Sequence, residues 1–464
     1  MLRTRFEDVE RSAPFQAMQS QILTHTLANA QRQLEPANLP AEIVALQHRV
    51  HERLLAEIDQ QRLASLPRDV ARRSLVDAAL EILATEQQHA LGDYRLLIIE
   101  SIADDVIGYG PLEPLLRDGS ITEIMVNGPF QIWVERRGRI SKTGYAFRDQ
   151  DHLLRIIERI VSPLGRHVDE ANPMVDARLP DGSRVNVVLP PAAPRGATIT
   201  LRKFARERLM IDDLVRSGSL SELARDFLKA CVQAKLNIIV SGGTGTGKTT
   251  LLNVLSSFIG EDERIITVED PLELQLQQPH VVSLEARPPG VEGSHQISQR
   301  DLVRNALRMR PDRILVGEVR GGEAFDMLQA MNTGHDGSIG TVHANTPRDA
   351  LARIQNMVLM SGLDLPDQVI RDQIVSAIDL VVQIARMTDG SRRVTQISEV
   401  SGIEGSTPVL RDIFVLEMVS GADSEERPDL IPTGAEPGFA DRFSRHRVSF
   451  ALSALQREGQ ESIR

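Results

Sequence analysis

The sequence predicts an α/β protein. Its largest domain contains a mixed, mostly parallel sheet, and a small α+β domain and a helical bundle precede it. Three observations support this prediction. A glycine-rich loop lies between an apolar strand-like run and a helix-like run at residues 236–255. Beyond that loop, short apolar runs alternate with helical segments, the rhythm of a parallel sheet with crossover helices. Ahead of it, β-like runs joined by turns follow a stretch of helical periodicity.

Length and composition limit the class of protein. A chain of 464 residues predicts about three domains. A net charge of −11 argues against a nucleic-acid motor, which needs a strongly basic surface. The single cysteine, Cys231, excludes a four-cysteine zinc site, so no zinc is predicted. No apolar run approaches about 18 residues, and no signal peptide is visible. We therefore expect a cytoplasmic protein that reaches a membrane only through partners.

Periodicity and punctuation divide the chain into six predicted segments. Ile43, Leu46 and Val50 fall at helical spacing and open the bundle. Residues 421–440 are rich in Pro, Gly, Asp and Glu and poor in apolar side chains, which is typical of disorder. The six segments are a flexible N-terminal segment (1–40), the helical bundle (41–108), the small α+β domain (109–204), a linker (205–210), the parallel-sheet domain (211–420) and a mostly disordered C-terminal tail (421–464).

The parallel-sheet domain shows its strands as short apolar runs. Residues 265–268, 313–316 and 338–342 are such runs, and helical segments separate them. After Leu380 the runs become strand-rich, which indicates an antiparallel extension of the same sheet.

The glycine-rich loop carries the strongest chemical signal. Residues Gly242 to Thr249 match G-x-x-x-x-G-K-[ST] between a strand and a helix, the context of a phosphate cradle. Lys248 is predicted to reach the β- and γ-phosphates, and the Thr249 hydroxyl to ligate Mg²⁺. We therefore predict ATP and Mg²⁺ as ligands. The predicted nucleotide-binding residues are Gly243, Thr244, Gly245, Thr246, Gly247, Lys248, Thr249 and Thr250.

Carboxylates follow two of the predicted strands. The run 265–268 ends in Glu269, and the run 313–316 is followed by Gly317 and Glu318. Carboxyl ends of parallel strands meet at the edge of the sheet where ligands bind. Glu269 is the candidate to activate water. Glu318 is the candidate to anchor the Mg²⁺ shell together with Thr249.

Histidines and arginines complete the candidate set. His335 and His343 bracket a predicted strand beside a glycine-rich turn, and we expect them to report the γ-phosphate by hydrogen bonding. Arg184 follows an Asp-Gly-Ser turn, and Arg202 ends the strand before the linker. Either arginine can stabilise the charge that develops in phosphoryl transfer, with a surface salt bridge as the open alternative.

Four motifs in order carry a resemblance to a known superfamily. They read SGGTGTGKTTLLN, ITVEDPLEL, RMRPDRILVGEVRGGEA and TGHDGSIGTVHANTP. They resemble the Walker A, Asp-box, Walker B and His-box of the type II/type IV secretion ATPases. The small-domain segments DARLPDGSRVNVVLPP and ITLRKF match the same superfamily. The wording is most similar to the Flp/Tad pilus assembly ATPases of the CpaF type, and the resemblance covers roughly residues 90–420.

The resemblance implies a RecA-like ATPase domain, a homohexameric ring, and ATP bound between the small domain and the RecA-like domain. Glu269 looks like the Asp-box catalytic carboxylate and Glu318 like the Walker B glutamate. His335 and His343 look like the His-box pair, and Arg184 and Arg202 look like the arginines that close over the nucleotide. The zinc element of many type II secretion and pilus extension ATPases is missing, which favours the Flp/Tad or type IV secretion branch.

The function implied is a motor that hydrolyses ATP to assemble a Flp/Tad-type pilus, with retraction left open. It would work through an inner-membrane platform protein and sit peripherally on that membrane. One alternative is a type IV secretion ATPase that drives protein or DNA–protein export. Another is a nucleotide-binding ring scaffold with little turnover, against which the intact Lys248, Thr249, Glu269 and Glu318 argue. A nucleic-acid translocase is disfavoured by the acidic charge.

Overall fold

The computed structural model describes residues 40–59, 63, 65–86, 94–136, 138–204, 209–287, 296–420 and 426–456. The chain divides into two compact units between Arg206 and Glu207, a point inside the segment predicted as a linker. Each unit is described by itself. The segment predicted to be flexible, 1–40, lies outside the described residues except for Pro40.

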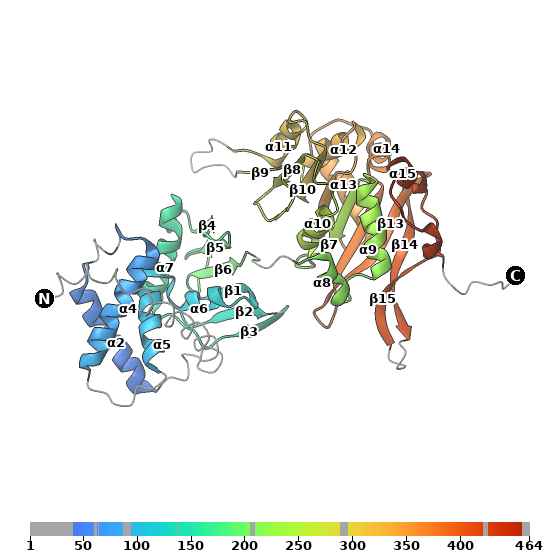
Figure 1. Cartoon of the computed structure of the whole chain (residues 1–464). Coiled ribbons are helices and arrows are strands. Elements are labelled where there is room, and N and C mark those ends of the chain that lie inside the picture. Colours follow the sequence, from blue (N-terminus) through green and yellow to red (C-terminus); the bar gives the residue numbers. More distant parts are fainter. Residues whose placement is uncertain are drawn as a thin grey trace. The chain divides into compact units, whose positions relative to one another are not determined.

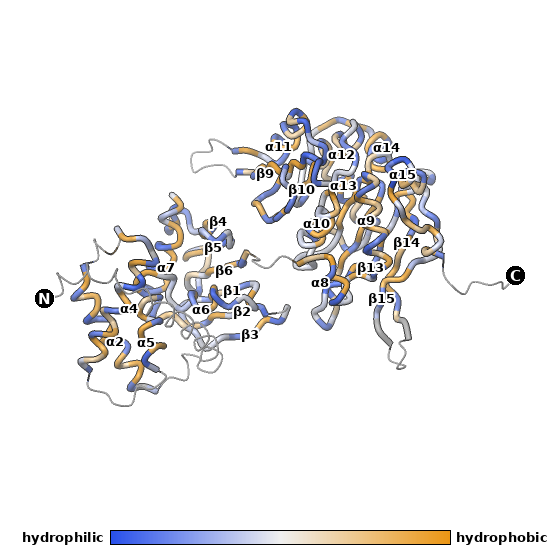
Figure 2. The backbone as a smooth tube through the Cα atoms, in the orientation of Figure 1, coloured by the Kyte–Doolittle hydropathy of each residue, from blue (hydrophilic) through white to orange (hydrophobic). Residues whose placement is uncertain are grey.

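The first described elements of unit 1 are the helices α2 (Ala41–Glu57), α4 (Arg68–Thr85) and α5 (Tyr94–Ile107), shown in Figure 1. The first two begin directly after a proline, which fixes its own φ and needs no N–H partner. The tube in Figure 2 changes between apolar and polar colour along α2 and α4, as expected for helices that bury one face. Their shared core includes Leu46, Leu54, Leu75, Ile98 and Ile102.

The remainder of unit 1 is a six-stranded antiparallel sheet in the order β3-β2-β1-β6-β5-β4. Helix α7 (Gln150–Val161), capped by Asp149, packs on it through Leu153, Ile156 and Ile157. The bundle and the sheet have separate cores but form one compact unit, whereas the sequence predicts two domains. The strands are β1 (Ile121–Asn127), β2 (Ile132–Arg136), β3 (Arg139–Lys142), β4 (Met174–Arg178), β5 (Arg184–Val188) and β6 (Thr198–Arg202).

Unit 2 is built on a nine-stranded sheet in the order β15-β14-β13-β12-β7-β11-β10-β8-β9. All pairs from β12 to β9 are parallel, and β13, β14 and β15 extend the sheet antiparallel. The predicted α/β class with a mixed, mostly parallel sheet is confirmed. The strands are β7 (Ile238–Gly242), β8 (Ile265–Glu269), β9 (Val281–Glu285), β10 (Arg313–Val319), β11 (Ile339–His343), β12 (Leu380–Arg386), β13 (Arg392–Glu404), β14 (Thr407–Ser420) and β15 (Glu426–Pro432).

Helices cover this sheet on both faces, so its central strands are buried on both sides. Along β7, Ile238 and Val240 belong to one apolar core while Ile239 belongs to the other. Continuous apolar runs are the expected sequence of such strands. The helices are α8 (Ile211–Arg216), α9 (Glu222–Gln233), α10 (Lys248–Ser256), α11 (Gln299–Ala306), α12 (Glu323–Asn332), α13 (Pro347–Leu359) and α14 (Asp367–Ala377).

The prediction of a mostly disordered C-terminal tail is wrong for residues 426–456. Strand β15 pairs with β14, and α15 (Ala440–Arg445) and a short 3-10 helix (Leu452–Leu455) follow it. Phe443 is buried, with its ring centroid 6.4 Å from that of Phe227 and 6.0 Å from that of Phe450. The segment is poor in apolar residues overall, but a few large aromatic side chains bury enough area to dock it.

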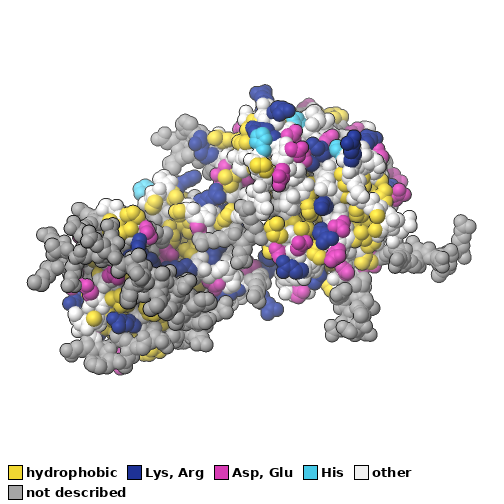
Figure 3. All heavy atoms as spheres, viewed as in Figure 1, with side chains coloured by type: hydrophobic (Ala, Val, Ile, Leu, Met, Phe, Trp, Pro, Cys, Tyr) yellow, Lys and Arg dark blue, Asp and Glu magenta, His cyan; other side chains and the backbone are white. Residues whose placement is uncertain are grey.

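The described residues contain no helix that is both long and apolar enough to cross a membrane. Acidic and basic side chains intermingle on the face of unit 2 in view in Figure 3, and no single basic patch dominates that face.

Candidate active site

The glycine-rich loop connects the end of β7 to the start of α10, as the sequence predicts. Gly245 and Gly247 have φ values of 70° and 98°, a region that glycine tolerates and other residues avoid. Gly242 is needed for a different reason. A Cβ added there would lie 2.5 Å from the backbone oxygen of Ile384 on the neighbouring strand β12. The loop therefore has the backbone shape that its glycines permit.

The start of α10 fits a phosphate group. Gly247 is the N-cap residue, and no side chain caps the first turn of the helix. The first N–H groups of a helix lack intrahelical partners, and the helix dipole makes this end positive. Lys248 Nζ lies across the loop and donates to the Gly243 carbonyl oxygen at 2.9 Å. Uncapped N–H groups and an ammonium at one glycine loop suit the phosphates of a nucleotide.

Arg392, which the sequence analysis missed, also holds this loop. It is the first residue of β13, and its Nε donates to the Gly245 carbonyl oxygen at 3.0 Å. Its own backbone oxygen accepts a hydrogen bond from the Ser219 hydroxyl at 2.5 Å. Arg392 lies 147 residues from Gly245, and only the pairing of β12 with both β7 and β13 brings the two together.

Glu318 lies where strand β10 approaches the loop, and basic groups surround it. Arg320 NH2 donates to Glu318 Oε2 at 2.6 Å. Burial, the largest influence, acts to raise the pKa of Glu318. The hydrogen bond and charge of Arg320, with the charge of Lys248, outweigh it and lower that pKa. Glu318 is therefore ionised at neutral pH and close to the phosphate-binding lysine.

His343 ends strand β11 beside the same loop. In the parallel pairing of β11 with β7, it lies opposite Gly242. Burial, followed by the charge of Lys248, lowers the pKa of His343. At neutral pH the imidazole is therefore uncharged, and it can donate one hydrogen bond and accept another.

Glu269 is also at the carboxyl edge of the sheet, but it is 1% exposed and engaged by three donors. Oε1 accepts from the Thr267 hydroxyl at 2.9 Å, and Oε2 accepts from the N–H groups of Glu273 and Leu274 at 2.6 and 2.8 Å. Burial raises the pKa of Glu269, against these hydrogen bonds. The carboxylate holds the chain that follows β8, and three of its roughly four acceptor positions are occupied by donors from the protein.

Thr249 and Glu318 are the residues suited to Mg²⁺. Hydroxyl and carboxylate oxygens are the ligand types that Mg²⁺ selects, and the metal usually keeps several waters and shares substrate phosphates. The described part of the chain holds no cluster of three His, Cys, Asp or Glu residues that could bind a metal ion by itself. When bound, the ion would neutralise phosphate charge.

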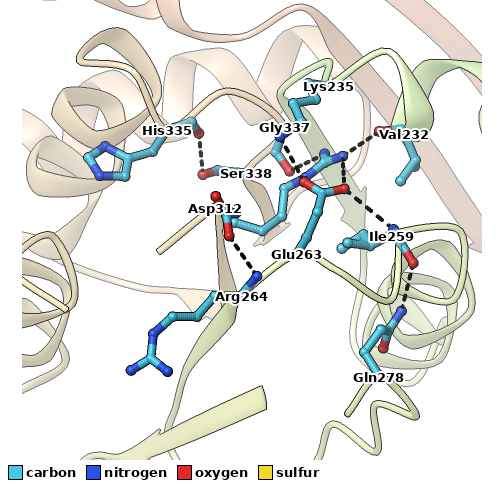
Figure 4. Close-up of polar contacts among 12 residues, drawn as sticks. Val232, Lys235, Ile259, Glu263, Arg264, Gln278, Asp312, His335, Gly337 and Ser338 are labelled. Atoms are coloured by element: carbon cyan, nitrogen blue, oxygen red, sulfur yellow. Dashed lines mark hydrogen bonds and ion pairs between the residues drawn. The ribbon is translucent and has the colours of Figure 1, made fainter. Parts of the chain in front are cut away.

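His335 does not join this site within unit 2. It precedes β11, whereas His343 ends that strand, so β11 separates the two residues along the sheet. Figure 4 places His335 at the opposite edge, with its ring pointing away from Glu263 and its backbone oxygen accepting from the Ser338 hydroxyl at 2.8 Å. The expected histidine pair at one γ-phosphate is therefore wrong for a single unit 2, because a strand has one end at each edge.

Arg184 and Arg202 belong to unit 1, where they are direct cross-strand partners on β5 and β6. Arg178 on β4 is the partner of Arg184, so three arginines form a row across three strands. Arg202 is half exposed, with Glu123 Oε1 3.9 Å from its Nε. The sequence analysis missed Arg178, although counting residues on either side of the turn at Asp181 finds it.

The comparison with protein families agrees with this site. The model described as "Type II/IV secretion system protein" matches residues 105–411. The chain belongs to this family. With its complete phosphate-binding loop, this family member is an ATP hydrolase.

Among similar proteins is a putative conjugal transfer protein of Mycobacterium tuberculosis. It is 38% identical over 322 residues, which cover 68% of this chain and 91% of that protein. The type IV secretion system protein VirB11 of Bartonella henselae is 34% identical over 351 residues, which cover 67% of this chain and 95% of that protein. The crystal structure of the VirB11 ATPase of the Brucella suis type IV secretion system, in complex with sulphate, is 31% identical. The matched region covers 62% of this chain and 95% of the VirB11 chain, and the TM-score is 0.35.

Proposed function

We propose that this family member is a motor that hydrolyses ATP to power assembly of a Flp/Tad-type pilus. The observation that carries ATP use is the meeting of Lys248, Glu318 and His343 at one edge of the sheet. The shift in the pKa of Glu318 arises in part from the charge of Lys248, and His343 lies opposite Gly242 of the same loop in the pairing of β11 with β7. A lysine, a carboxylate and a neutral imidazole at a phosphate-binding loop are the parts that phosphoryl transfer needs.

Each residue has a distinct part in the proposed reaction. Lys248 and the N–H groups of α10 hold the β- and γ-phosphates in place. The Glu318 carboxylate, kept ionised by its basic neighbours, orients the attacking water and the Mg²⁺ shell. His343 hydrogen bonds to the γ-phosphate side of the site. Glu269 holds the chain after β8 through its three donors and can take the proton of the attacking water at a remaining lone pair.

We also propose that Arg184 and Arg202 act on the nucleotide. Their position as cross-strand neighbours lets them reach one phosphate group together, and Arg178 extends the row. Two or three guanidinium groups aimed at a γ-phosphate would favour closure of unit 1 over the nucleotide, and hydrolysis would remove that attraction. Six such subunits would form a ring whose closing and opening moves a platform protein in the inner membrane. The ring would be associated with that membrane peripherally, through the platform protein.

A type IV secretion ATPase is the second candidate function. It is favoured by the names of the relatives, which include VirB11 of Bartonella henselae and the type IV secretion system protein PtlH of Bordetella pertussis. The pilus proposal is supported by the wording of the four motifs and by the helical bundle that precedes the sheet of unit 1.

A deletion strain tests the choice between these functions. Complementation with the wild-type gene should restore surface pili, and complementation with a Lys248→Ala gene should not. Loss of protein or DNA–protein export with pili unaffected would select the type IV secretion function. The same Lys248→Ala protein, purified, should bind ATP more weakly and not hydrolyse it, and turnover near wild type would remove the basis of both proposals.

A further inference from the structure

A cavity of about 1080 Å³ lies within unit 1, away from the phosphate-binding loop. It is lined by residues of α2, the beginning of α4, the end of α5 and the beginning and middle of α7, and by Ile58, Leu63 and Leu66 between α2 and α4. Pockets for small molecules have volumes of roughly 300–1,000 Å³. The cavity is therefore large enough for a ligand of nucleotide size, and neither the predicted nor the proposed activity uses it.

The lining has an apolar part and a polar part. The apolar part comes from Leu55, Ile58, Leu63, Leu66, Ile107 and Ile156. The polar part comes from His48, His51, Asp105, Arg148, His152 and Arg155, with Glu52, Asp149 and Arg159 beside them. Most small-molecule sites combine an apolar surface with a few polar groups that fix orientation.

Two arginines of the polar part lack carboxylate partners. Arg148 NH1 lies 3.1 Å from His51 Nδ1, and among the described residues neither Arg148 nor the exposed Arg155 forms an ion pair. Arg159 differs from them, because its NH1 donates to the backbone oxygens of Asp105 and Gly108 at 2.8 and 2.6 Å. Arg148 and Arg155 therefore keep their charge available for a bound anion.

The buried histidines next to these arginines do not neutralise them and carry no charge themselves. Burial, followed by the charge of Arg148, lowers the pKa of both His51 and His152 to about 4. His152 Nδ1 accepts from the Arg148 N–H at 3.3 Å, which leaves the proton on Nε2. That Nε2 is buried and makes no hydrogen bond to a described residue; Asp105 Oδ1 lies 3.5 Å away.

The carboxylates of the lining, Glu52, Asp105 and Asp149, balance the arginine charge in number, but none of them forms an ion pair with Arg148 or Arg155. Asp149 is committed to α7, because its Oδ1 accepts from the His152 N–H at 2.7 Å. Burial raises the pKa of Asp105 to about 6, so part of its charge is lost just below neutral pH. The polar part therefore presents the guanidinium groups of Arg148 and Arg155, neither of which is in an ion pair with a described carboxylate.

We propose that this cavity binds a small organic phosphate, with its phosphate at Arg148, Arg155 and the histidines and its organic part against the leucines and isoleucines. Guanidinium groups bind phosphate oxygens with charge-assisted hydrogen bonds. Helix α7 carries His152 and Arg155 towards the cavity and Leu153 and Ile157 into the core beneath the sheet. A ligand there contacts the helix that supports the strands of Arg184 and Arg202.

Inorganic pyrophosphate is the probe that tests the phosphate end. It is titrated calorimetrically into full-length Lys248→Ala protein, in which the phosphate-binding loop is weakened. Adding Arg148→Gln and Arg155→Gln should lower the affinity at least about tenfold, because two charged hydrogen-bond donors are lost. Arg148→Lys with Arg155→Lys keeps the charge and should retain most of the binding. Arg139→Gln, an exposed arginine of β3, is the matched control and should change nothing.

Equal pyrophosphate affinity in all these proteins, or no binding in the Lys248→Ala protein, would overturn the proposal. A lipid headgroup could present the same phosphate chemistry, so sedimentation with phosphatidylglycerol vesicles is the second arm. Vesicle binding that depends on Arg148 and Arg155, without pyrophosphate binding, would also overturn the proposal of a soluble ligand. Because both arginines are exposed, all variants should keep the melting temperature of the parent protein. A lower melting temperature only in the protein with Arg148→Gln and Arg155→Gln would assign the arginines a structural role.

Discussion

The parallel strands of the nine-stranded sheet have their carboxyl ends at one edge and their amino ends at the other. The charged pair of Glu318 and Arg320 at the carboxyl edge is partly exposed, whereas the pair of Arg313 and Glu263 at the amino edge is largely buried. At the carboxyl edge, Glu318 is ionised and partly exposed, and its hydrogen-bond partner Arg320 is half exposed. At the amino edge, Arg313 is fully buried. Its guanidinium donates two hydrogen bonds to Glu263 and one each to the backbone oxygens of Val232 and Gly337. Figure 4 shows these three partners.

The amino edge is completed by groups that satisfy one another. Asn237 uses its side chain fully: Oδ1 accepts from the N–H groups of Gly337 and Ser338, and Nδ2 donates to the backbone oxygens of Met331 and Ala377. Arg442 of α15 binds Asp379 through two contacts of 2.8 Å. Charges that are paired inside the protein hold strands together, whereas charges left near an opening are available to a ligand. The amino edge therefore stabilises the fold, and the carboxyl edge carries the proposed chemistry.

The largest expected effect is on turnover. Lys248→Ala removes the ammonium that faces the phosphates, and we expect ATP turnover to fall by about 10²–10³ or more. The matched control is Lys235→Ala at the amino edge, where Nζ lies 2.9 Å from Glu263 Oε2. It should lower the melting temperature and leave turnover per folded protein unchanged. If the two lysine variants lose turnover equally, the division between the edges fails.

The next effect is on stability. Arg313→Leu leaves the Glu263 carboxylate without its main partner, and breaking such a buried pair costs about 3–5 kcal/mol of unfolding free energy. Urea unfolding measures the loss. The double variant Arg313→Leu/Glu263→Leu should recover much of it, because the charge then left without a carboxylate is that of Lys235, which is partly exposed. A double variant as unstable as the single one would contradict the pairing.

The dependence of stability on acid pH is a second test of the Arg313–Glu263 pair. Burial acts to raise the pKa of Glu263, but the hydrogen bond and charge of Arg313, with those of Lys235, lower it to about 2. A carboxylate with a folded pKa below its unfolded value adds stability that is present above the unfolded pKa and is lost as pH falls. For Glu263 that window runs from about 4.5 down to about 2, and the double variant should lack this part of the acid dependence.

Phe443→Ala tests whether the C-terminal segment belongs to the amino-edge structure. Removing this buried ring from the cluster with Phe227 and Phe450 should cost about 3 kcal/mol. Phe130→Ala, at a side chain that is 63% exposed, is the control and should change stability by less than about 0.5 kcal/mol. Equal melting temperatures for both variants would mean that residues 426–456 do not dock in solution.

The smallest effect concerns Arg392, which supports the phosphate-binding loop from β13. Arg392→Gln removes a charged donor to the Gly245 carbonyl, and we expect ADP to bind about tenfold more weakly. Arg393→Gln changes the adjacent arginine, whose NH1 contacts the backbone oxygen of Gly218 instead, and should leave ADP binding unchanged. Calorimetric titration with ADP gives the comparison. Similar losses in both variants would assign Arg392 to general stability.

The sequence predicts local features well and distant pairings poorly. The loop at 242–249, the strands at 265–268 and 313–316, and the carboxylates Glu269 and Glu318 depend on neighbours in the chain, and the structure has them where periodicity and motif place them. The contact between Arg392 and Gly245 depends on strand order, which no local pattern gives. His335 was placed with His343 because both lie in one motif, yet the strand between them carries them to opposite edges.

The C-terminal segment was misassigned for a related reason. Its average composition is that of a disordered chain, but stability depends on the few residues that are buried rather than on the average. Phe439, Phe443 and Leu455 are buried. Arg442 donates a hydrogen bond to Asp379, which lies 63 residues earlier in the chain.

The most direct test of the comparison is one paired measurement on two glutamates. ATP turnover and the urea midpoint of unfolding are measured for Glu318→Gln and for Glu263→Gln. We predict that Glu318→Gln lowers turnover by at least about 100-fold with an unchanged midpoint, because its ion pair is partly exposed. Glu263→Gln should lower the midpoint and keep turnover per folded protein. Turnover retained in Glu318→Gln, or lost only together with stability, would contradict the assignment of chemistry to the carboxyl edge.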